Sequence, residues 1–116
     1  MKKVVKFGGS SLASAEQFKK VGDIIRADKS RRYVVPSAPG KRSSSDTKVT
    51  DMLYSCYNLA IREKKFTSLL AEIQARYNEI IDGLELDLSL DHEFDLIRET
   101  LAKKSEETTR HPAENT

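Results

Sequence analysis

The sequence predicts an α/β fold in which a short parallel β-α-β unit is followed by a helical segment. Two short runs at 4–7 and 33–35 are rich in Val and aromatic residues, and they flank a stretch with apolar residues at helical spacing. After residue 48, three further stretches repeat the helical spacing. Both strand runs are nearly continuously apolar, which is typical of strands that are covered on both faces.

The first strand, built around Val4, Val5 and Phe7, ends at a glycine turn. Gly8 and Gly9 let backbone amides approach a ligand, and Ser10 adds a hydroxyl donor. A strand, a glycine turn and a helix start together form an arrangement that holds phosphate. Lys6 can place a cation beside the same oxygens, although the spacing is not that of a Walker A loop. A tight turn without a ligand is the alternative interpretation.

The first helix is expected over residues 14–27, because Ser14 and Gln17 have capping-box spacing. Its apolar stripe consists of Phe18, Val21, Ile24 and Ile25. The second strand follows at 33–35 and is ended by Pro36. The two strands should lie parallel, with a right-handed crossover through this helix.

A loop rich in turn formers and hydroxyls, residues 37–48, follows the second strand and carries Lys41, Arg42 and Lys48. Ligands of open α/β sheets bind beyond the carboxyl ends of the strands, where this loop and the glycine turn should both emerge. Ser37 begins this loop. We therefore expect the two loops to share an anionic ligand, with a flexible solvated loop as the alternative.

Three more helices are expected, at 49–63, 66–81 and 91–103. Thr50 lies in the first turn of the helix expected at 49–63, close enough to the loop to reach a ligand. Gly83 is expected to stop the second. Residues 1–104 should form the ordered domain, and residues 105–116 should be a frayed or disordered tail.

Composition narrows the function classes. With 116 residues the chain is at most one domain, and Cys56 suits a core position and a reducing, cytoplasmic compartment. Residues 1–50 carry a net charge of +8 and residues 51–116 carry −6, which favours an anionic ligand near the glycine turns. Scattered basic residues and few aromatic residues argue against nucleic acid. We expect no membrane span, no signal peptide and no metal site at the isolated His92 and His111.

Three motifs in order resemble the start of an aspartokinase, a member of the amino-acid kinase family. They are Lys-Phe-Gly-Gly-Ser-Ser at 6–11, Val-Pro-Ser-Ala-Pro-Gly-Lys-Arg at 35–42, and Lys-Val-Thr-Asp-Met-Leu at 48–53. The resemblance covers residues 2–63 well. It implies that the chain is part of an α/β/α sandwich.

The resemblance also implies transfer of the γ-phosphoryl group of ATP to the β-carboxylate of aspartate, a step toward lysine, threonine and methionine. Lys6 would neutralise charge on the transferring group, and Gly8, Gly9 and Ser10 would supply the phosphate-facing loop. Ser37 would lie against the phosphates, and Thr50 matches the position that contacts aspartate. Magnesium would arrive bound to ATP, without a dedicated carboxylate site.

Several family segments have no counterpart in these 116 residues: Ser-Arg-Gly-Glu, Gly-Arg-Gly-Gly-Ser-Asp, the adenine-binding part and the regulatory ACT domains. We therefore expect the front part of a kinase domain that does not phosphorylate aspartate alone. Two alternatives stay open: a phosphate- or nucleotide-binding fragment without turnover, and a helical module for self-association or for pairing with other kinase segments.

Overall fold

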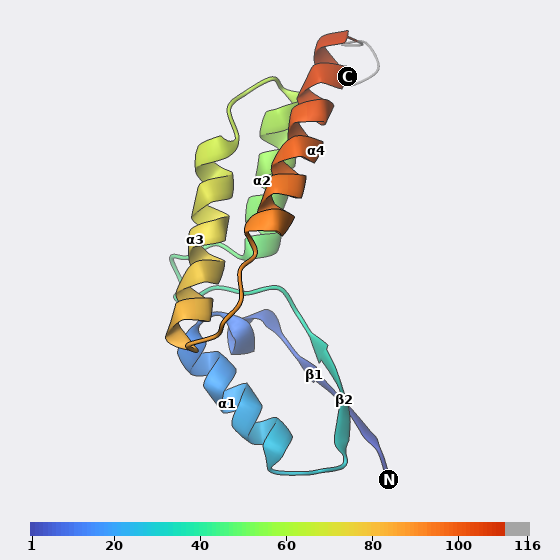
Figure 1. Cartoon of the computed structure of the whole chain (residues 1–116), viewed down its shortest axis with the longest axis vertical. Coiled ribbons are helices and arrows are strands. Elements are labelled where there is room, and N and C mark those ends of the chain that lie inside the picture. Colours follow the sequence, from blue (N-terminus) through green and yellow to red (C-terminus); the bar gives the residue numbers. More distant parts are fainter. Residues whose placement is uncertain (111–116) are drawn as a thin grey trace. The chain divides into compact units, whose positions relative to one another are not determined.

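The computed structural model describes residues 1–110 and divides the chain into two compact units. The first unit contains Met1–Thr50 and Glu79–Asp87, and the second contains Asp51–Asn78 and the chain from Leu88 onward. Within the first unit the order is β1 (Lys3–Phe7), a 3₁₀ turn η1 (Gly9–Leu12), α1 (Ala15–Arg26) and β2 (Arg31–Pro36) (Figure 1).

β1 and β2 form a parallel pair, which confirms the predicted β-α-β unit. The register pairs Val4 with Tyr33 and Lys6 with Val35. Ser14 caps α1 as predicted, since its Oγ accepts a hydrogen bond from the backbone N of Gln17 at 3.4 Å. The described structure is therefore mixed α/β, and it is the β-α-β unit that brings the two loops after the strands to one edge.

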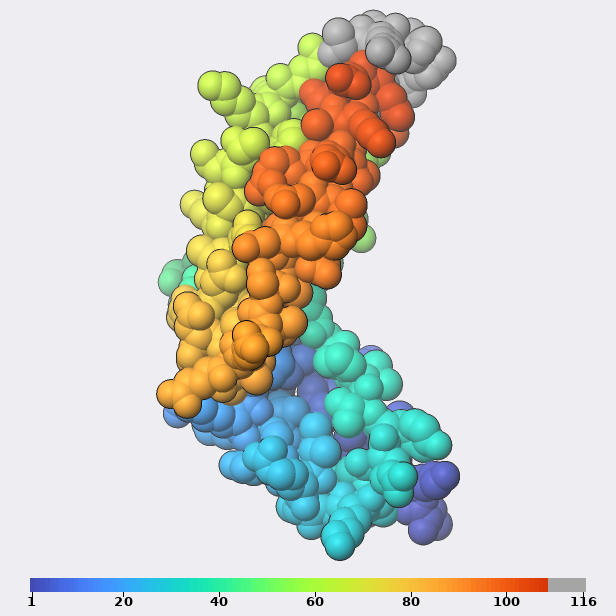
Figure 2. Space-filling view, viewed as in Figure 1, coloured from blue at the N-terminus to red at the C-terminus, as the bar shows by residue number. Residues whose placement is uncertain are grey.

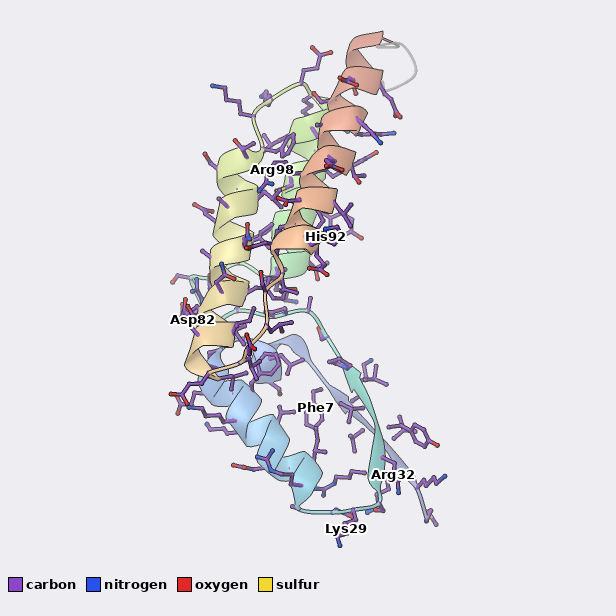
Figure 3. The ribbon with its side chains drawn as sticks, viewed as in Figure 1. Phe7, Lys29, Arg32, Asp82, His92 and Arg98 are labelled. Carbon is purple, nitrogen blue, oxygen red and sulfur yellow. The ribbon has the colours of Figure 1, made fainter. Side chains whose placement is uncertain are left out.

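The two faces of this sheet differ in exposure. Strand alternation and the register put Val4, Tyr33 and Val35 on one face, where they are 69%, 53% and 48% exposed. Figure 2 shows the β2 surface in teal. Phe7 lies on the other face, in the space between β1 and α1 (Figure 3). The described residues thus leave one face of the sheet open and cover the α1 face only in part, since Val34 on that face is 41% exposed.

The second unit is helical and is built from most of α2 (Val49–Ile61), most of α3 (Thr67–Gly83) and α4 (Asp91–Arg110). The rings of Tyr77 and Phe94 meet edge to face between α3 and α4, with centroids 5.9 Å apart. Cys56 is fully buried, which confirms its predicted core position. The buried apolar residues of this unit are Met52, Cys56, Ala60, Phe66, Leu70, Ile73, Phe94 and Leu101.

α4 ends later than the sequence indicated. It continues to Arg110 instead of ending near Lys103, and Thr108 is buried on it. The Oγ1 of Thr108 donates a hydrogen bond to the carbonyl of Lys104 at 3.2 Å, so a polar side chain is satisfied within the helix. The expected tail, residues 105–116, therefore begins inside α4. Residues 111–116 of that tail lie outside the described residues.

Two glutamates, not a glycine, take the left-handed position after α2 and α3. Glu63 has a φ of 56° and Glu85 a φ of 55°. The backbone N of Leu86 bonds to the carbonyl of Ile81 at 3.1 Å, and that of Glu85 to Asp82 at 3.0 Å, which is a Schellman ending. α3 ends at Gly83, as predicted, but Gly83 is itself helical and the left-handed residue of the ending is Glu85. No helix among the described residues meets the length and apolarity that a membrane span requires.

Candidate functional site

A cavity of about 350 Å³ lies in the first unit, where the chain leaves the carboxyl ends of β1 and β2. Its walls come from the glycine turn after β1, from the loop after β2 and from the start of α2. The lining residues are Gly9, Ser10, Ser37, Ala38, Pro39, Gly40, Lys41, Lys48 and Thr50. The volume lies in the range of small-molecule sites. The predicted meeting of the two loops at one sheet edge is therefore confirmed.

Two glycines hold the loops together. The backbone N of Gly40 donates a hydrogen bond to the carbonyl of Gly9 at 2.8 Å. A Cβ on Gly40 would lie 2.5 Å from the carbonyl carbon of Gly9 and 2.8 Å from the backbone N of Ser10. Because real Cβ atoms do not approach backbone this closely, only glycine fits at position 40 without a shift.

Backbone hydrogen bonds fix Ser37 and Thr50 at the cavity, through the N–H of Ser37 itself and through the N–H of Val49, which precedes Thr50. The backbone N of Ser37 donates to the carbonyl of Phe7 at 3.1 Å, which extends the ladder one residue past β2. The Oγ of Ser37 donates to the carbonyl of Ala38 at 3.0 Å. The backbone N of Val49 donates to the carbonyl of Pro39 at 3.0 Å, and this bond sets the entry of α2 and with it Thr50.

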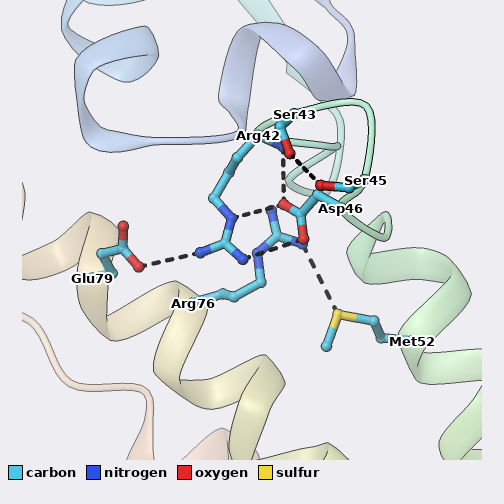
Figure 4. Close-up of polar contacts among 7 residues, drawn as sticks. All are labelled: Arg42, Ser43, Ser45, Asp46, Met52, Arg76 and Glu79. Carbon is cyan, nitrogen blue, oxygen red and sulfur yellow. Dashed lines mark hydrogen bonds and ion pairs between the residues drawn. The ribbon is translucent and has the colours of Figure 1, made fainter.

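The cavity is electropositive. Of its nine lining residues within the described part of the chain, Lys41 and Lys48 are cationic and none is acidic. The third cation of the loop, Arg42, is paired elsewhere: its Nε lies 2.7 Å from Oδ2 of Asp46, and its Nη1 lies 3.3 Å from Oε2 of Glu79 (Figure 4). The hydrogen bond to Asp46 raises the pKa of Arg42 further above its ordinary value.

The structure brings together four of the six site residues that the sequence indicated: Gly9, Ser10, Ser37 and Thr50. Gly8 and Lys6 are not among the lining residues. Lys6 pairs with Val35 across the sheet, and strand alternation puts it on the exposed face, opposite Phe7. The roles assigned to all six stay predictions.

Sequence reasoning gave no site role to three lining residues of the second loop, Ala38, Pro39 and Gly40. The adjacent Pro and Gly in the sequence predict a turn at these positions, but they do not indicate which part of the chain lies next to that turn. The sequence identified Lys41 and Lys48 as cations of the loop but did not assign them to a binding site, whereas the structure has both among the lining residues.

The chemistry available at this cavity is the binding of an anion. Hydroxyls, glycine backbone and two ammonium groups suit phosphate oxygens. No group of three or more His, Cys, Asp or Glu side chains suited to a metal ion occurs in residues 1–110. Any divalent metal at this cavity would need ligands from the anion itself or from groups outside this lining.

Comparison with known proteins identifies relatives that match most of this chain. The sequence model of the amino acid kinase family matches residues 1–106. Aspartokinase 3 of Bacillus subtilis is 46% identical over 88 residues, which is 76% of this chain and 19% of the relative. An aspartokinase of Chlamydia pneumoniae is 37% identical over 87 residues, covering 74% of this chain and 18% of the relative.

A solved structure gives the same result for the fold. The crystal structure of the aspartate kinase of Clostridium acetobutylicum, described as an allosteric enzyme, superposes with a TM-score of 0.83 at 41% sequence identity. The match covers 89% of this chain and 24% of that one. The chain thus spans about a fifth to a quarter of the length of the relatives it matches.

Proposed function

Because this chain belongs to the amino acid kinase family, we propose that it forms the front part of an aspartokinase and contributes the phosphate-binding loops of that enzyme. The activity is transfer of the γ-phosphoryl group of ATP to the β-carboxylate of aspartate. The observation that carries the proposal is the electropositive cavity formed by the two loops after β1 and β2. Its position beyond the carboxyl ends of parallel strands is the usual place for a nucleotide in α/β proteins.

The phosphates are bound by the residues that line both loops. Gly9 and Ser10 approach from the first loop, and Ser37 approaches from the second. Lys41 and Lys48 supply positive charge to the bridging and terminal oxygens. Phosphoryl transfer depends on positioning and charge stabilisation more than on covalent chemistry, so such a set is suited to the reaction.

The roles of Lys6 and Gly8 are proposed from the sequence motif. The role of Lys6 in neutralising charge on the transferring phosphoryl group rests on the motif Lys-Phe-Gly-Gly-Ser-Ser, since Lys6 is not among the cavity's lining residues. Gly8 belongs to the same motif and precedes η1 directly. We assign both to the phosphate-facing turn on that resemblance.

Thr50 is proposed to contact aspartate from the first turn of α2, on the α2 side of the same cavity. Magnesium is proposed to enter as the ATP complex, because the lining residues offer it no carboxylate. We place the enzyme in the cytoplasm, because both proposed substrates, ATP and aspartate, are present there.

The proposal is tested by calorimetry of the 116-residue chain with ATP and magnesium, followed by a coupled assay with aspartate. We expect ATP to bind and turnover to stay at the level of a Lys6→Ala control. Lys48→Ala should weaken ATP binding by about tenfold, the usual effect of removing one charged contact to phosphate. An absence of ATP binding at millimolar concentration contradicts the proposal, and turnover above the control contradicts the expectation of inactivity.

A second candidate, an interaction module, is favoured by exposed apolar side chains in each unit taken separately. Tyr54 on α2 is 66% exposed and Leu96 on α4 is 49% exposed. On the first unit, Val4 and Tyr33 are exposed on the open face of the sheet. Size-exclusion chromatography with light scattering checks this candidate: a monomer that does not bind a hydrophobic dye contradicts self-association through these surfaces.

A further inference from the structure

The loop between β2 and α2 contains an ion pair with closely matched geometry. The guanidinium of Arg42 contacts both carboxylate oxygens of Asp46, Nε to Oδ2 at 2.7 Å and Nη2 to Oδ1 at 3.2 Å (Figure 4). The backbone N of Arg42 also donates to Oδ2 of Asp46 at 2.9 Å. The side chain of Asp46 is only 15% exposed. A bidentate pair of this kind restricts the loop more than a single-contact surface pair does.

The pair closes residues 42–46 into a turn at the tip of the loop. Within it the backbone N of Asp46 donates to the carbonyl of Ser43 at 3.1 Å. The base of the loop is closed separately, by the bond from the backbone N of Val49 to the carbonyl of Pro39 and by the bond from Gly40 to Gly9. The loop is therefore fixed at both its base and its tip.

Lys41 and Lys48 lie between these two closures, one on each side of the loop. Both line the cavity, whereas Arg42 does not. The three cations of the loop thus have different surroundings: Arg42 is paired with two carboxylates, Asp46 and Glu79, and the two lysines are among the cavity's lining residues. Pairing Arg42 also removes part of the repulsion that three cations in eight residues would exert on one another.

We propose that Arg42 and Asp46 are positioning residues whose ion pair orders the loop so that Lys41 and Lys48 are presented to the phosphates of the ligand. The inference rests on the proposed function, since it assumes that the cavity binds phosphate. Ordering the loop before the ligand arrives lowers the entropy cost of binding, because the backbone that carries the two lysines is fixed in advance.

The direction in which Asp46→Asn changes the affinity for anions distinguishes a positioning role of the ion pair from a purely electrostatic effect of the charge. Asp46→Asn removes a negative charge near an anion site, and Coulomb's law alone then predicts tighter anion binding. Loss of the bidentate pair frees the loop, and the positioning role predicts weaker binding. Asp46→Glu keeps the charge but moves the carboxylate by one methylene group, so it should also weaken binding if geometry is what matters.

The experiment is calorimetry of the unmodified chain and both Asp46 variants with tripolyphosphate and with ATP and magnesium. NMR relaxation of the Lys41 and Lys48 amides is measured on the same samples without ligand. Asp95→Asn is the matched control, because Asp95 forms an ion pair with Arg98 at 2.7 Å on α4, in the other unit. We expect Asp46→Asn to weaken the binding of both anions by about tenfold and to increase the mobility of both amides. Asp95→Asn should change neither property.

The outcomes separate the two proposals. Unchanged or tighter anion binding by Asp46→Asn overturns the positioning role, and so do amides that stay ordered in this variant. If Asp46→Asn does not fold, the same readings are taken on Asp46→Glu. If the unmodified chain binds neither anion, the proposed function fails. The relaxation data then still decide whether the ion pair orders the two lysines.

Discussion

Gly40 donates its backbone N–H to the carbonyl of Gly9 at 2.8 Å, and a Cβ on Gly40 would lie 2.5 Å from the Gly9 carbonyl carbon. This contact joins the two loops of the cavity, so its loss should affect stability and ligand binding together. We predict that Gly40→Ala lowers the free energy of unfolding by about 1–3 kcal/mol, the usual cost of overpacking. ATP binding measured by calorimetry should weaken in the same variant.

Gly8→Ala is the control for the stability part of this prediction. No atom lies within 4 Å of a Cβ built on Gly8, and its φ of −77° suits any residue. Its thermal midpoint should therefore match that of the unmodified chain. A Gly40→Ala chain as stable as Gly8→Ala would show that the loops are not held by close backbone contact.

The second prediction concerns Gly83 and Ala15, both in the first unit. A Cβ on Gly83 would lie 2.5 Å from the Cβ of Ala15, the first residue of α1. Gly83→Ala should thus destabilise the chain by about 1–2 kcal/mol, even though alanine is the better helix former. Adding Ala15→Gly should restore much of the loss in chemical denaturation. Two independent, additive losses would contradict the contact.

The third prediction is a gain in stability at the ends of α2 and α3. Glu63 and Glu85 hold left-handed conformations in which glycine avoids the steric cost of a side chain. Glu63→Gly and Glu85→Gly should each raise the free energy of unfolding by about 0.5–1 kcal/mol. Glu72→Gly, inside α3, is the opposing control and should lower it by about 1 kcal/mol. A loss of stability at either helix end would contradict the prediction.

The helices and strands were predictable because their signals are local. The Ser14 cap, the apolar spacing of α1 and the Val-rich strands each follow from neighbours in sequence. Helix ends were harder: Gly83 was expected to end α3 because glycine favours left-handed φ, but it is required by contact with Ala15, 68 positions earlier in the chain. A glycine's two possible roles, conformation and close approach, look the same in a sequence.

The candidate site was predictable in outline, since parallel strands bring their carboxyl-end loops together whatever the loops contain. The distribution of charge within the second loop was not. Lys41, Arg42 and Lys48 are similar cations in the sequence, and only the fold shows that Asp46 and Glu79 pair with Arg42 while the lysines line the cavity. Glu79 lies 37 positions from Arg42, so no local pattern contains this partner.

The fourth prediction is an acid-sensitive contribution from Asp28, which lies between α1 and β2. Its Oδ1 accepts hydrogen bonds from Ser30 Oγ at 2.6 Å and from the backbone N of Ser30 at 2.9 Å, and its Oδ2 lies 2.9 Å from Nζ of Lys3. These contacts, with the Ser30 hydroxyl the largest, lower the pKa of Asp28 well below its ordinary range.

Because the pKa is lower in the folded state, the unfolded chain binds the proton first as the pH falls. The contribution of Asp28 is therefore complete above about pH 4, the ordinary range of an aspartate, and declines below it. Asp28→Asn should make the free energy of unfolding less dependent on pH between about 2 and 4 in chemical denaturation. Ser30→Ala should reduce that dependence more than Lys3→Gln does, and added salt should weaken only the part due to Lys3. An unchanged pH profile in Asp28→Asn would show that this carboxylate has the same pKa in both states.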